Sequence, residues 1–518
     1  MKLQALSAAV AALALVLTAC SSAPPGESGD EGSGSVRTDA VVATTGEIRT
    51  LDPTALSTAF TSGGDRASAI FGSLMKYDEE GGVVPAMAQS LESDDLKVWT
   101  LTLRDGVEFT DGTPYDAEAV LFNIDRHRAE DSTSPAKSLL SSVESIEILD
   151  PLTLEFTLVR PSGSFPSLLT NNTTLGYIGS PTAMQADPEG FSTAPVAAGP
   201  FVMEEWVRDS HMSLTANPDY WDADNVALTS LRFNTIADAQ TRTQALMSKA
   251  LDLAPPLQGS EWVQFRDNDD FVIYLEGSLG AQSFYPNVSR GPMTDPEVRR
   301  AVQMGIDPKS ANTVLNADAI EWDGDHDCVP FVPDTDACSS GSYPDADIEE
   351  AKRIIADYAA DGGDVKVRML STVTQKYYHD YFELVLTELG FDVEVNAADL
   401  TQFAGQTVEG NYDVIVALRL PFVSPFPAFF NQISNTGSNY LKHEDAEFQA
   451  ALETARDASP EDQAAAWGEV NRQIGEKGYA FWATPSSNRA ISVAEFHPGN
   501  ALTIGGGGVW YPADAYFS

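Results

Sequence analysis

The sequence has few cysteines, few positive charges and few histidines. Its 518 residues include 3 cysteines, 31 lysines and arginines and 6 histidines, against 76 aspartates and glutamates, and the formal net charge is −45. Three cysteines are too few for a disulfide-rich scaffold. Nucleic-acid binding depends on lysine and arginine to neutralise the phosphate charges, and so acidic a surface repels a polyanion. The composition therefore argues against a disulfide-dense fold and against nucleic acid as a partner.

Catalytic, nucleotide-binding and metal-binding motifs are also missing. The sequence contains no Gly-x-Ser-x-Gly, no Gly-Lys-Ser/Thr and no His-Glu-x-x-His, and His443-Glu444 lacks the second histidine. Gly505 to Gly508 do not make a nucleotide loop, because Trp510 occupies the last glycine position. The acidic run before Cys328 is not a calcium loop, because that cysteine stands where glycine is needed. We expect no catalytic residues, no metal and no cofactor.

The remaining composition is that of a folded protein. Hydrophobic residues make up 43% of the chain and charged residues 21%, an apolar share that is ordinary for globular proteins. At about 150 residues per domain, the length predicts about three domains.

The N-terminus has the pattern of an export signal. Lys2 precedes an apolar run from Leu3 to Leu17, which is shorter than the roughly 20 residues of a membrane span. No later stretch approaches 18 consecutive apolar residues. The sequence Leu17-Thr18-Ala19-Cys20 resembles the lipobox of bacterial lipoproteins. That resemblance implies removal of residues 1–19 as a signal peptide and lipid modification of Cys20.

Two further expectations follow from export. Residues 20–38 are rich in serine, glycine, proline and acidic residues, and we expect the lipidated cysteine and a flexible tether there. Cys328 and Cys338 are separated by nine residues. Because disulfides persist outside the cytoplasm, we expect these two cysteines to be bonded.

Strand-like and helix-like patterns alternate in the second half of the chain. Apolar side chains recur at helical spacing from Tyr378 to Leu389, and Gly390 supplies a stop. Strands separated by helices imply a parallel sheet, so an α/β fold is predicted here. The expected strands are 365–370, 391–395 and 412–418, and the expected helices are 348–358, 378–389, 399–409 and one that starts at Asp295-Pro296.

The first half is predicted to contain a compact α+β unit. Val98 to Leu103 and Thr153 to Leu158 alternate as strands that can pair, and Asp116 to Arg128 forms a helix between them.

Short motifs follow one another in a fixed order along most of the chain. They are Thr50-Leu51-Asp52-Pro53, 70–77, 85–90, 99–114, 117–123, Gly199-Pro200-Phe201 with Glu205-Trp206, 217–221, 295–307 and 410–413. In this order they resemble the bacterial extracytoplasmic solute-binding proteins of family 5, the oligopeptide-, dipeptide- and nickel-binding proteins of ABC importers.

The resemblance implies a type II periplasmic-binding-protein-like, two-lobed α/β fold with an additional α+β domain. Domain I is expected at 39–74, 171–284 and 481–518, domain II at 75–170 and domain III at 285–480. A small solute, by default a peptide or peptide-like compound, is expected between domains I and III, which close about a hinge. The implied protein is a monomer that is not an enzyme, is lipid-anchored outside the cytoplasmic membrane and delivers its solute to ABC permease subunits.

One motif of peptide-binding relatives is altered. In those relatives the strand equivalent to 412–418 is followed by Gly-Trp-x-x-Asp, whose aspartate pairs with the α-ammonium of the peptide. Pro421 stands at that position here, so the usual peptide anchoring requires another acid. Arg419 is expected either to meet an anionic group of the ligand or to pair with a neighbouring structural acid.

The expected ligand contacts combine aromatic walls with few polar groups, as small-ligand pockets do. Any one of the aromatic residues is alternatively a core residue. The candidate ligand-binding residues are Leu418, Arg419, Phe422, Phe426, Tyr440, Trp482, Phe122 and Asn287.

Other functions stay open at this point. Within the solute-binding class, the ligand is alternatively an oligosaccharide, a metal chelate or an opine-like metabolite. A secreted hydrolase predicts a clustered nucleophile, base and orienting acid in one cleft. A structural surface protein predicts a cleft too shallow to bury a ligand.

Overall fold

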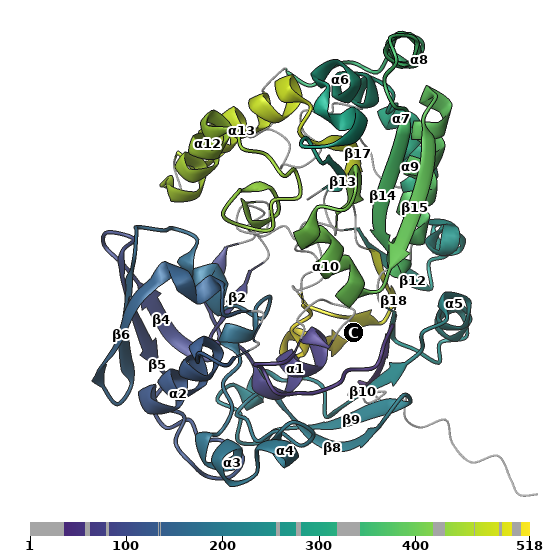
Figure 1. The fold of residues 1–518 in the computed structure, drawn as a ribbon. Coiled ribbons are helices and arrows are strands. Elements are labelled where there is room, and N and C mark those ends of the chain that lie inside the picture. Colours follow the sequence, from purple (N-terminus) through teal and green to yellow (C-terminus); the bar gives the residue numbers. More distant parts are fainter. Residues whose placement is uncertain are drawn as a thin grey trace, which may run out of the picture. The chain divides into compact units, whose positions relative to one another are not determined.

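The computed structural model describes residues 36–56, 63–78, 82–132, 134, 136–254, 259–275, 281–318, 342–417, 430–459, 462–485, 489–499 and 509–518. Residues 38–518 form one compact unit (Figure 1). Within these described ranges, the β structure consists of three larger sheets and two short ribbons.

The largest sheet has seven strands and contains both parallel and antiparallel pairs. Strand β1 lies between β10 and β11 and is parallel to both, whereas β8, β9, β12 and β18 join by antiparallel pairing. In spatial order the strands are β12 (Phe271–Leu275), β18 (Arg489–Val493), β11 (Leu253–Ala254), β1 (Asp39–Thr44), β10 (Ser230–Thr235), β9 (His211–Ala216) and β8 (Phe201–Val207).

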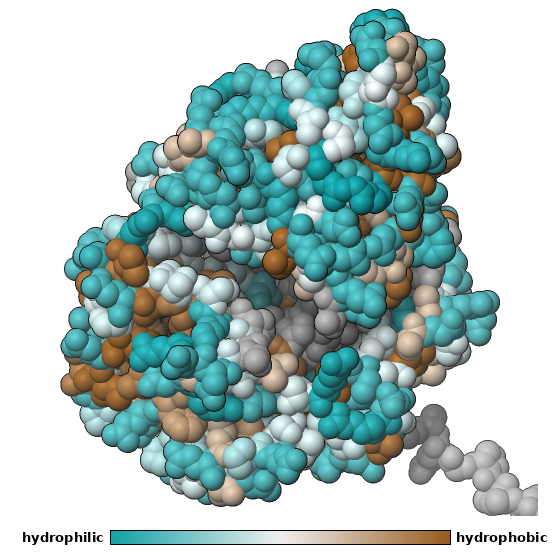
Figure 2. Space-filling view, in the orientation of Figure 1, coloured by the Kyte–Doolittle hydropathy of each residue, from teal (hydrophilic) through white to brown (hydrophobic). Residues whose placement is uncertain are grey.

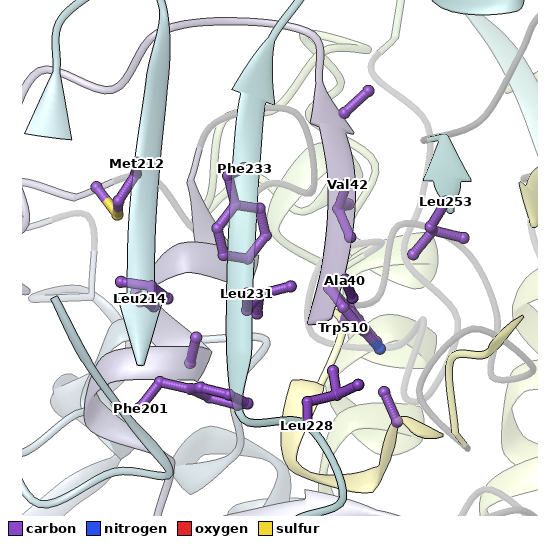
Figure 3. Close-up of a cluster of buried hydrophobic side chains, with 14 of the residues drawn as sticks. Ala40, Val42, Phe201, Met212, Leu214, Leu228, Leu231, Phe233, Leu253 and Trp510 are labelled. Carbon is purple, nitrogen blue, oxygen red and sulfur yellow. The ribbon is translucent and has the colours of Figure 1, made fainter. Parts of the chain in front are cut away.

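One face of the seven-stranded sheet carries a hydrophobic core. Figure 3 shows side chains of β1, β9, β10 and β11 pointing to the same side, among them Val42, Leu214, Phe233 and Leu253. The indole of Trp510 belongs to this cluster, and its Nε1 donates to the carbonyl of Pro498 at 2.6 Å. The C-terminal segment is thus packed into the core of this sheet.

The second sheet has five strands and is covered on both faces. Its order is β15 (Asp392–Ala398), β14 (Lys366–Thr372), β16 (Val414–Val416), β13 (Ala281–Pro286) and β17 (Phe481–Pro485). Alternate residues enter two different cores: Phe284 and Phe481 pack into one, Tyr285 and Trp482 into the other. A strand buried on both faces is typical of α/β proteins.

Helices supply the two covers of the five-stranded sheet (Figure 1). Among the described helices, four contribute side chains to the core that contains Phe284 and Phe481. Three others contribute to the core that contains Tyr285 and Trp482. The first set is α6 (Pro296–Met304), α7 (Pro308–Asn316), α8 (Ile348–Ala360) and α9 (Lys376–Leu389); the second is α10 (Leu400–Glu409), α12 (Ala446–Asp457) and α13 (Gln463–Lys477).

The third sheet confirms the predicted α+β unit. Strands β5 (Val98–Leu103) and β7 (Thr153–Leu158) have the predicted bounds and pair antiparallel. They lie between β4 (Ala88–Glu92) and β6 (Val143–Asp150). Helix α2 (Ala117–Arg128) packs on this sheet, and the carboxylate of Asp116 caps it by accepting from the amide of Ala119.

The other described elements are short. They are α1 (Gly64–Phe71), α3 (Pro181–Ala186), α4 (Pro188–Phe191), α5 (Ala239–Met247) and the ribbons β2 (Met75–Tyr77) with β3 (Val83–Pro85) and β19 (Phe496–His497) with β20 (Tyr516–Phe517). Among the described residues, no helix has the length and apolarity needed to cross a membrane.

The predicted strand and helix order between 364 and 416 is confirmed. Strand β14 is parallel to β15 and to β16, and α9 and α10 lie between them in the sequence. Gly390 ends α9 with a left-handed φ of 108°, and Asp399 caps α10 through the amide of Gln402. Strand β16 is shorter than the expected 412–418 and ends at Val416.

The chain passes between the two larger sheets twice. Strand β12 is followed by β13 across residues 276–280, and β17 by β18 across 486–488. The two passages begin and end side by side, because Leu275 pairs with Arg489 in the seven-stranded sheet and Ala281 with Pro485 in the five-stranded sheet. The expected domain limits at 284/285 and 480/481 fall in β13 and at the start of β17, a few residues away from these passages.

Candidate functional site

The carboxyl edge of the five-stranded sheet carries a buried polar network. Strands β14 and β16 are parallel and end here, and in open α/β sheets ligands bind outside the carboxyl ends of the strands. The hydroxyl of Thr372 and the side chain of Gln375 lie 3.3 Å apart, and Nε2 of Gln375 donates to the carbonyl of Ala417 at 3.0 Å. Gln375 therefore fixes the end of β16, where the Gly-Trp-x-x-Asp motif of peptide-binding relatives would begin.

A second pair of polar contacts lies at the same edge, where β17 ends. Nδ2 of Asn316 donates to the hydroxyl of Thr484 at 2.9 Å and to Oδ1 of Asn312 at 3.1 Å. All three side chains are buried. Helix α7 is thereby tied to the strand that leads into the second passage between the sheets.

The edge also holds a serine, a histidine and an aspartate in contact. Nδ1 of His379 lies 3.0 Å from Oγ of Ser371, and its Nε2 lies 3.4 Å from Oδ1 of Asp380. Ser371 has no exposed surface, and its hydroxyl is engaged by the imidazole of His379. Burial is the main cause that lowers the pKa of His379. These contacts connect α9 to β14, and the serine hydroxyl is not a nucleophile exposed in a cleft.

Tyr440 and Trp482 are core residues on one face of the five-stranded sheet. Their ring centroids lie 6.0 and 6.1 Å from that of Tyr285, and all three rings belong to the same buried cluster as Ala417. Both are at most 9% exposed. Trp482 pairs with Ser283, whose carbonyl accepts from the amide of Ala417 at the end of β16, whereas the carbonyl of Tyr440 accepts from the hydroxyl of Tyr412, which precedes β16. Both present little surface to a ligand in this structure.

Asn287 lies at the opposite edge of the sheet from this polar network. It follows the carboxyl end of β13, which is antiparallel to β16. Its Nδ2 donates to the carbonyls of Gly410 and Tyr412 at 3.1 and 3.0 Å, and its Oδ1 accepts from Ser289. The amide thus fixes the entry to β16. The segment of Tyr440 lies beside it, because the amide of Val288 donates to the carbonyl of Leu441 at 2.8 Å.

Phe122 is separate as well. It lies on α2, is half-buried and packs against the core of the seven-stranded sheet.

The other candidates lie outside the described residues, and their roles stay predictions. They are Leu418, Arg419, Phe422 and Phe426, together with Pro421, the lipidation candidate Cys20 and the pair Cys328 and Cys338.

The carboxyl edge of the seven-stranded sheet holds an arginine that the sequence analysis did not single out. The parallel strands β1 and β10 end at Thr44 and Thr235, and Nη2 of Arg66 donates to the carbonyl of Gly46, two residues beyond β1, at 3.0 Å. Arg66 is 2% exposed and lies in the first turn of α1. A polar sequence such as Gly63-Gly64-Asp65-Arg66 gives no local signal of burial.

A small cavity is lined by the ribbon of β2 and β3, by residues 220–226 and by the C-terminal segment. Its volume is about 130 Å³, and Lys76, Tyr220, Trp221, Tyr511 and Asp514 are among its lining residues. Nζ of Lys76 contacts both carboxylate oxygens of Asp514 at 2.8 and 2.9 Å. Ligand pockets commonly measure about 300–1,000 Å³, so this cavity is too small for a peptide.

Figure 2 shows that the visible face is largely hydrophilic and is hollowed near its middle. The described part of the chain contains no cluster of three or more His, Cys, Asp or Glu side chains that suits a metal ion.

Comparisons with known proteins agree on one family. The family model for bacterial extracellular solute-binding proteins, family 5 Middle, matches residues 82–440. The glutathione-binding protein GsiB of Salmonella paratyphi A is 27% identical over 269 residues, 52% of each chain. The chain therefore spans about half the length of the curated relatives that it matches.

Solved structures share the mixed α/β fold over nearly the whole chain. The periplasmic binding protein DppA of Helicobacter pylori, in complex with the peptide STSA, superposes with a TM-score of 0.77 at 20% identity, covering 93% of this chain and 98% of that one. NikZ of Campylobacter jejuni, in complex with Ni(L-His), gives 0.74 at 18% identity, with 93% and 99% covered.

Proposed function

Because this chain belongs to the bacterial extracellular solute-binding proteins of family 5, we propose that it is the substrate-binding component of an ABC importer. It captures a small solute outside the cytoplasmic membrane and delivers it to the permease subunits. It acts as a monomer and performs no chemistry on the solute.

The observation that carries the proposal is the double passage between the two larger sheets. The strands that flank the two passages are paired, Leu275 with Arg489 and Ala281 with Pro485. Two adjacent crossings are the arrangement of a hinge that allows two lobes to close on a ligand. We accordingly assign one lobe to each large sheet and an accessory domain to residues 75–170.

The solute is by default a peptide or a peptide-like compound. GsiB is named for glutathione and the DppA structure holds a peptide, whereas NikZ holds a nickel–histidine complex. Pro421 stands where peptide-binding relatives have the aspartate that pairs with the peptide's ammonium group. An oligosaccharide, a metal chelate or an opine-like metabolite is therefore an alternative solute.

The first test is to identify what the purified protein carries. Small molecules released by denaturation are identified by mass spectrometry, and each identified compound is titrated into the ligand-free protein by calorimetry. We expect saturable binding of one solute per chain. Release of no solute, together with no binding of peptides, sugars or chelates, overturns the proposal.

We further propose that the mature N-terminus is the lipid anchor. Each acyl CH₂ buried in the membrane contributes about 0.8 kcal/mol, so two or three chains hold the protein firmly. Replacing Cys20 by alanine is expected to move the protein, expressed in a bacterial host, from the detergent phase to the aqueous phase of a Triton X-114 partition. Cys328→Ala is the matched control and should stay in the detergent phase. Equal partitioning of both variants with the unmodified protein contradicts the anchor.

A further inference from the structure

Arg66 is a buried cation with an incomplete set of partners. Its Nη2 donates to the carbonyl of Gly46, but its Nε, which is also buried, has no partner. No carboxylate of the described residues lies within 4 Å of its guanidinium. Buried polar groups are usually hydrogen-bonded, and the unsatisfied Nε of Arg66 calls for an explanation.

The charges of Asp65 and Glu47 attract the guanidinium of Arg66, but neither carboxylate accepts a hydrogen bond from its Nε. Oε1 of Glu47 accepts from the indole of Trp206 at 3.0 Å, its Oε2 accepts from the amide of Asp209 at 2.8 Å, and Arg208 lies 3.8 Å away. Oδ1 of Asp65 accepts from the amide of Trp510 at 2.8 Å. Burial raises the pKa of Asp65 to about 7, so this carboxyl is largely neutral below that pH.

The first turn of α1 adds to the positive potential at this place. Gly63 precedes the helix, adopts a left-handed φ of 110° and provides no side-chain cap. The N-terminus of a helix favours an anion through its amide groups and its dipole. The hydrogen bond of Arg66 to Gly46 directs its guanidinium to the carboxyl edge of the seven-stranded sheet, where parallel strands β1, β10 and β11 end.

We propose that Arg66 and the first turn of α1 bind an anionic group of the solute, a carboxylate in the first instance. The planar guanidinium suits two parallel hydrogen bonds to a carboxylate. This inference rests on the proposed function, because it takes residues 38–518 to hold a solute. Binding through Arg66 would give the site a preference for acidic solutes, although the net charge of the chain is −45.

The test compares an acid with its matched neutral amide. Leucyl-leucine and its C-terminal amide are titrated into ligand-free protein, and sodium acetate is compared with sodium chloride at equal ionic strength by thermal unfolding. The unmodified protein is expected to bind the acid about 10- to 100-fold more tightly than the amide, which is the usual worth of hydrogen bonds to a charged group. Arg66→Gln should remove that difference, and it should not lower the melting temperature of the ligand-free protein.

The control is Arg208→Gln, which removes a half-exposed arginine that donates to the carbonyls of Ile48 and Arg49 in the same loop. It should keep the preference for the acid. If Arg66→Gln does not fold, Arg66→Lys provides the test. Lysine keeps the charge but lacks the planar guanidinium, so the ratio of acid to amide affinity should fall. An unchanged ratio overturns the inference.

The outcomes separate this inference from the proposed function. Equal binding of acid and amide by the unmodified protein, or an unchanged ratio in Arg66→Gln, overturns the role of Arg66 while peptide binding stands. If neither peptide binds but acetate stabilises the unmodified protein and not Arg66→Gln, the role of Arg66 stands and the peptide is the wrong solute. If neither peptide nor acetate has an effect, the inference is overturned.

Discussion

Replacing Asp65 by asparagine is expected to raise the free energy of unfolding at pH 8 by about 4 kcal/mol. The carboxyl is 4% exposed, and desolvation is the main cause that raises its pKa from 3.8 to about 7. This shift is roughly three pKa units, and each unit corresponds to about 1.36 kcal/mol. Asparagine has nearly the same shape and keeps an oxygen that accepts from the amide of Trp510, but it carries no charge to bury.

The sign follows from proton linkage. The folded protein binds the proton of Asp65 more tightly than the unfolded chain does, so this group favours folding fully below pH 3.8. Its contribution is lost as the pH rises through 7. Asp65→Asn should therefore have nearly the stability of the unmodified protein at pH 4, and the gain should appear between pH 4 and 8.

The measurement is urea unfolding at several pH values across that window. Asp238→Asn is the control, because Asp238 is exposed, caps α5 through the amide of Thr241 and has a lowered pKa. It should show a small effect of the opposite sign. A loss of stability in Asp65→Asn at pH 8 contradicts the assignment of a costly buried charge.

Local patterns predicted the secondary structure well where the signal lies within a few residues. Strands β5 and β7 have the predicted bounds, because strict alternation of apolar and polar residues matches a sheet with one buried face. The helix that starts at Asp295-Pro296 is observed as α6, and Oδ1 of Asp295 accepts from the amide of Glu297 at 2.8 Å. N-caps and glycine stops depend only on neighbouring residues, which explains their success.

The candidate site was less predictable because burial there comes from distant segments. The carboxylate of Asp65 accepts a hydrogen bond from the amide of Trp510, which lies 445 positions further along the chain. No local sequence pattern predicts that contact. Asn287 directly follows β13, but which edge of the sheet it occupies depends on the antiparallel pairing of β13 with β16. Periodicity specifies an element and its buried face, whereas the location of a polar residue relative to a ligand depends on sheet topology.

Gly199→Ala is expected to destabilise the protein by about 3 kcal/mol, since extra atoms forced into a packed interior typically cost about 1–3 kcal/mol. A Cβ at this position would lie 2.5 Å from the amide nitrogen of Gly72 and closer still to the carbonyl oxygen of Ile70. Both are backbone atoms at the C-terminal end of α1 and cannot rotate away. The amide of Gly199 also donates to the carbonyl of Ile70 at 3.0 Å.

The control exchange is Gly405→Ala in α10. An added Cβ there meets nothing within 4 Å, and alanine in a helix is favoured over glycine by about 0.5–1 kcal/mol. The same substitution should thus change the free energy of unfolding with opposite signs at the two positions, as measured by urea unfolding.

The substitution at Gly199 should also affect solute binding. Because Gly199 packs α1 against the segment that leads into β8, Gly199→Ala should shift Arg66 and weaken the binding of an acidic solute. A Gly199→Ala protein as stable as the unmodified one would show that α1 moves freely, and Arg66 would then lack the fixed geometry that recognition of a carboxylate needs.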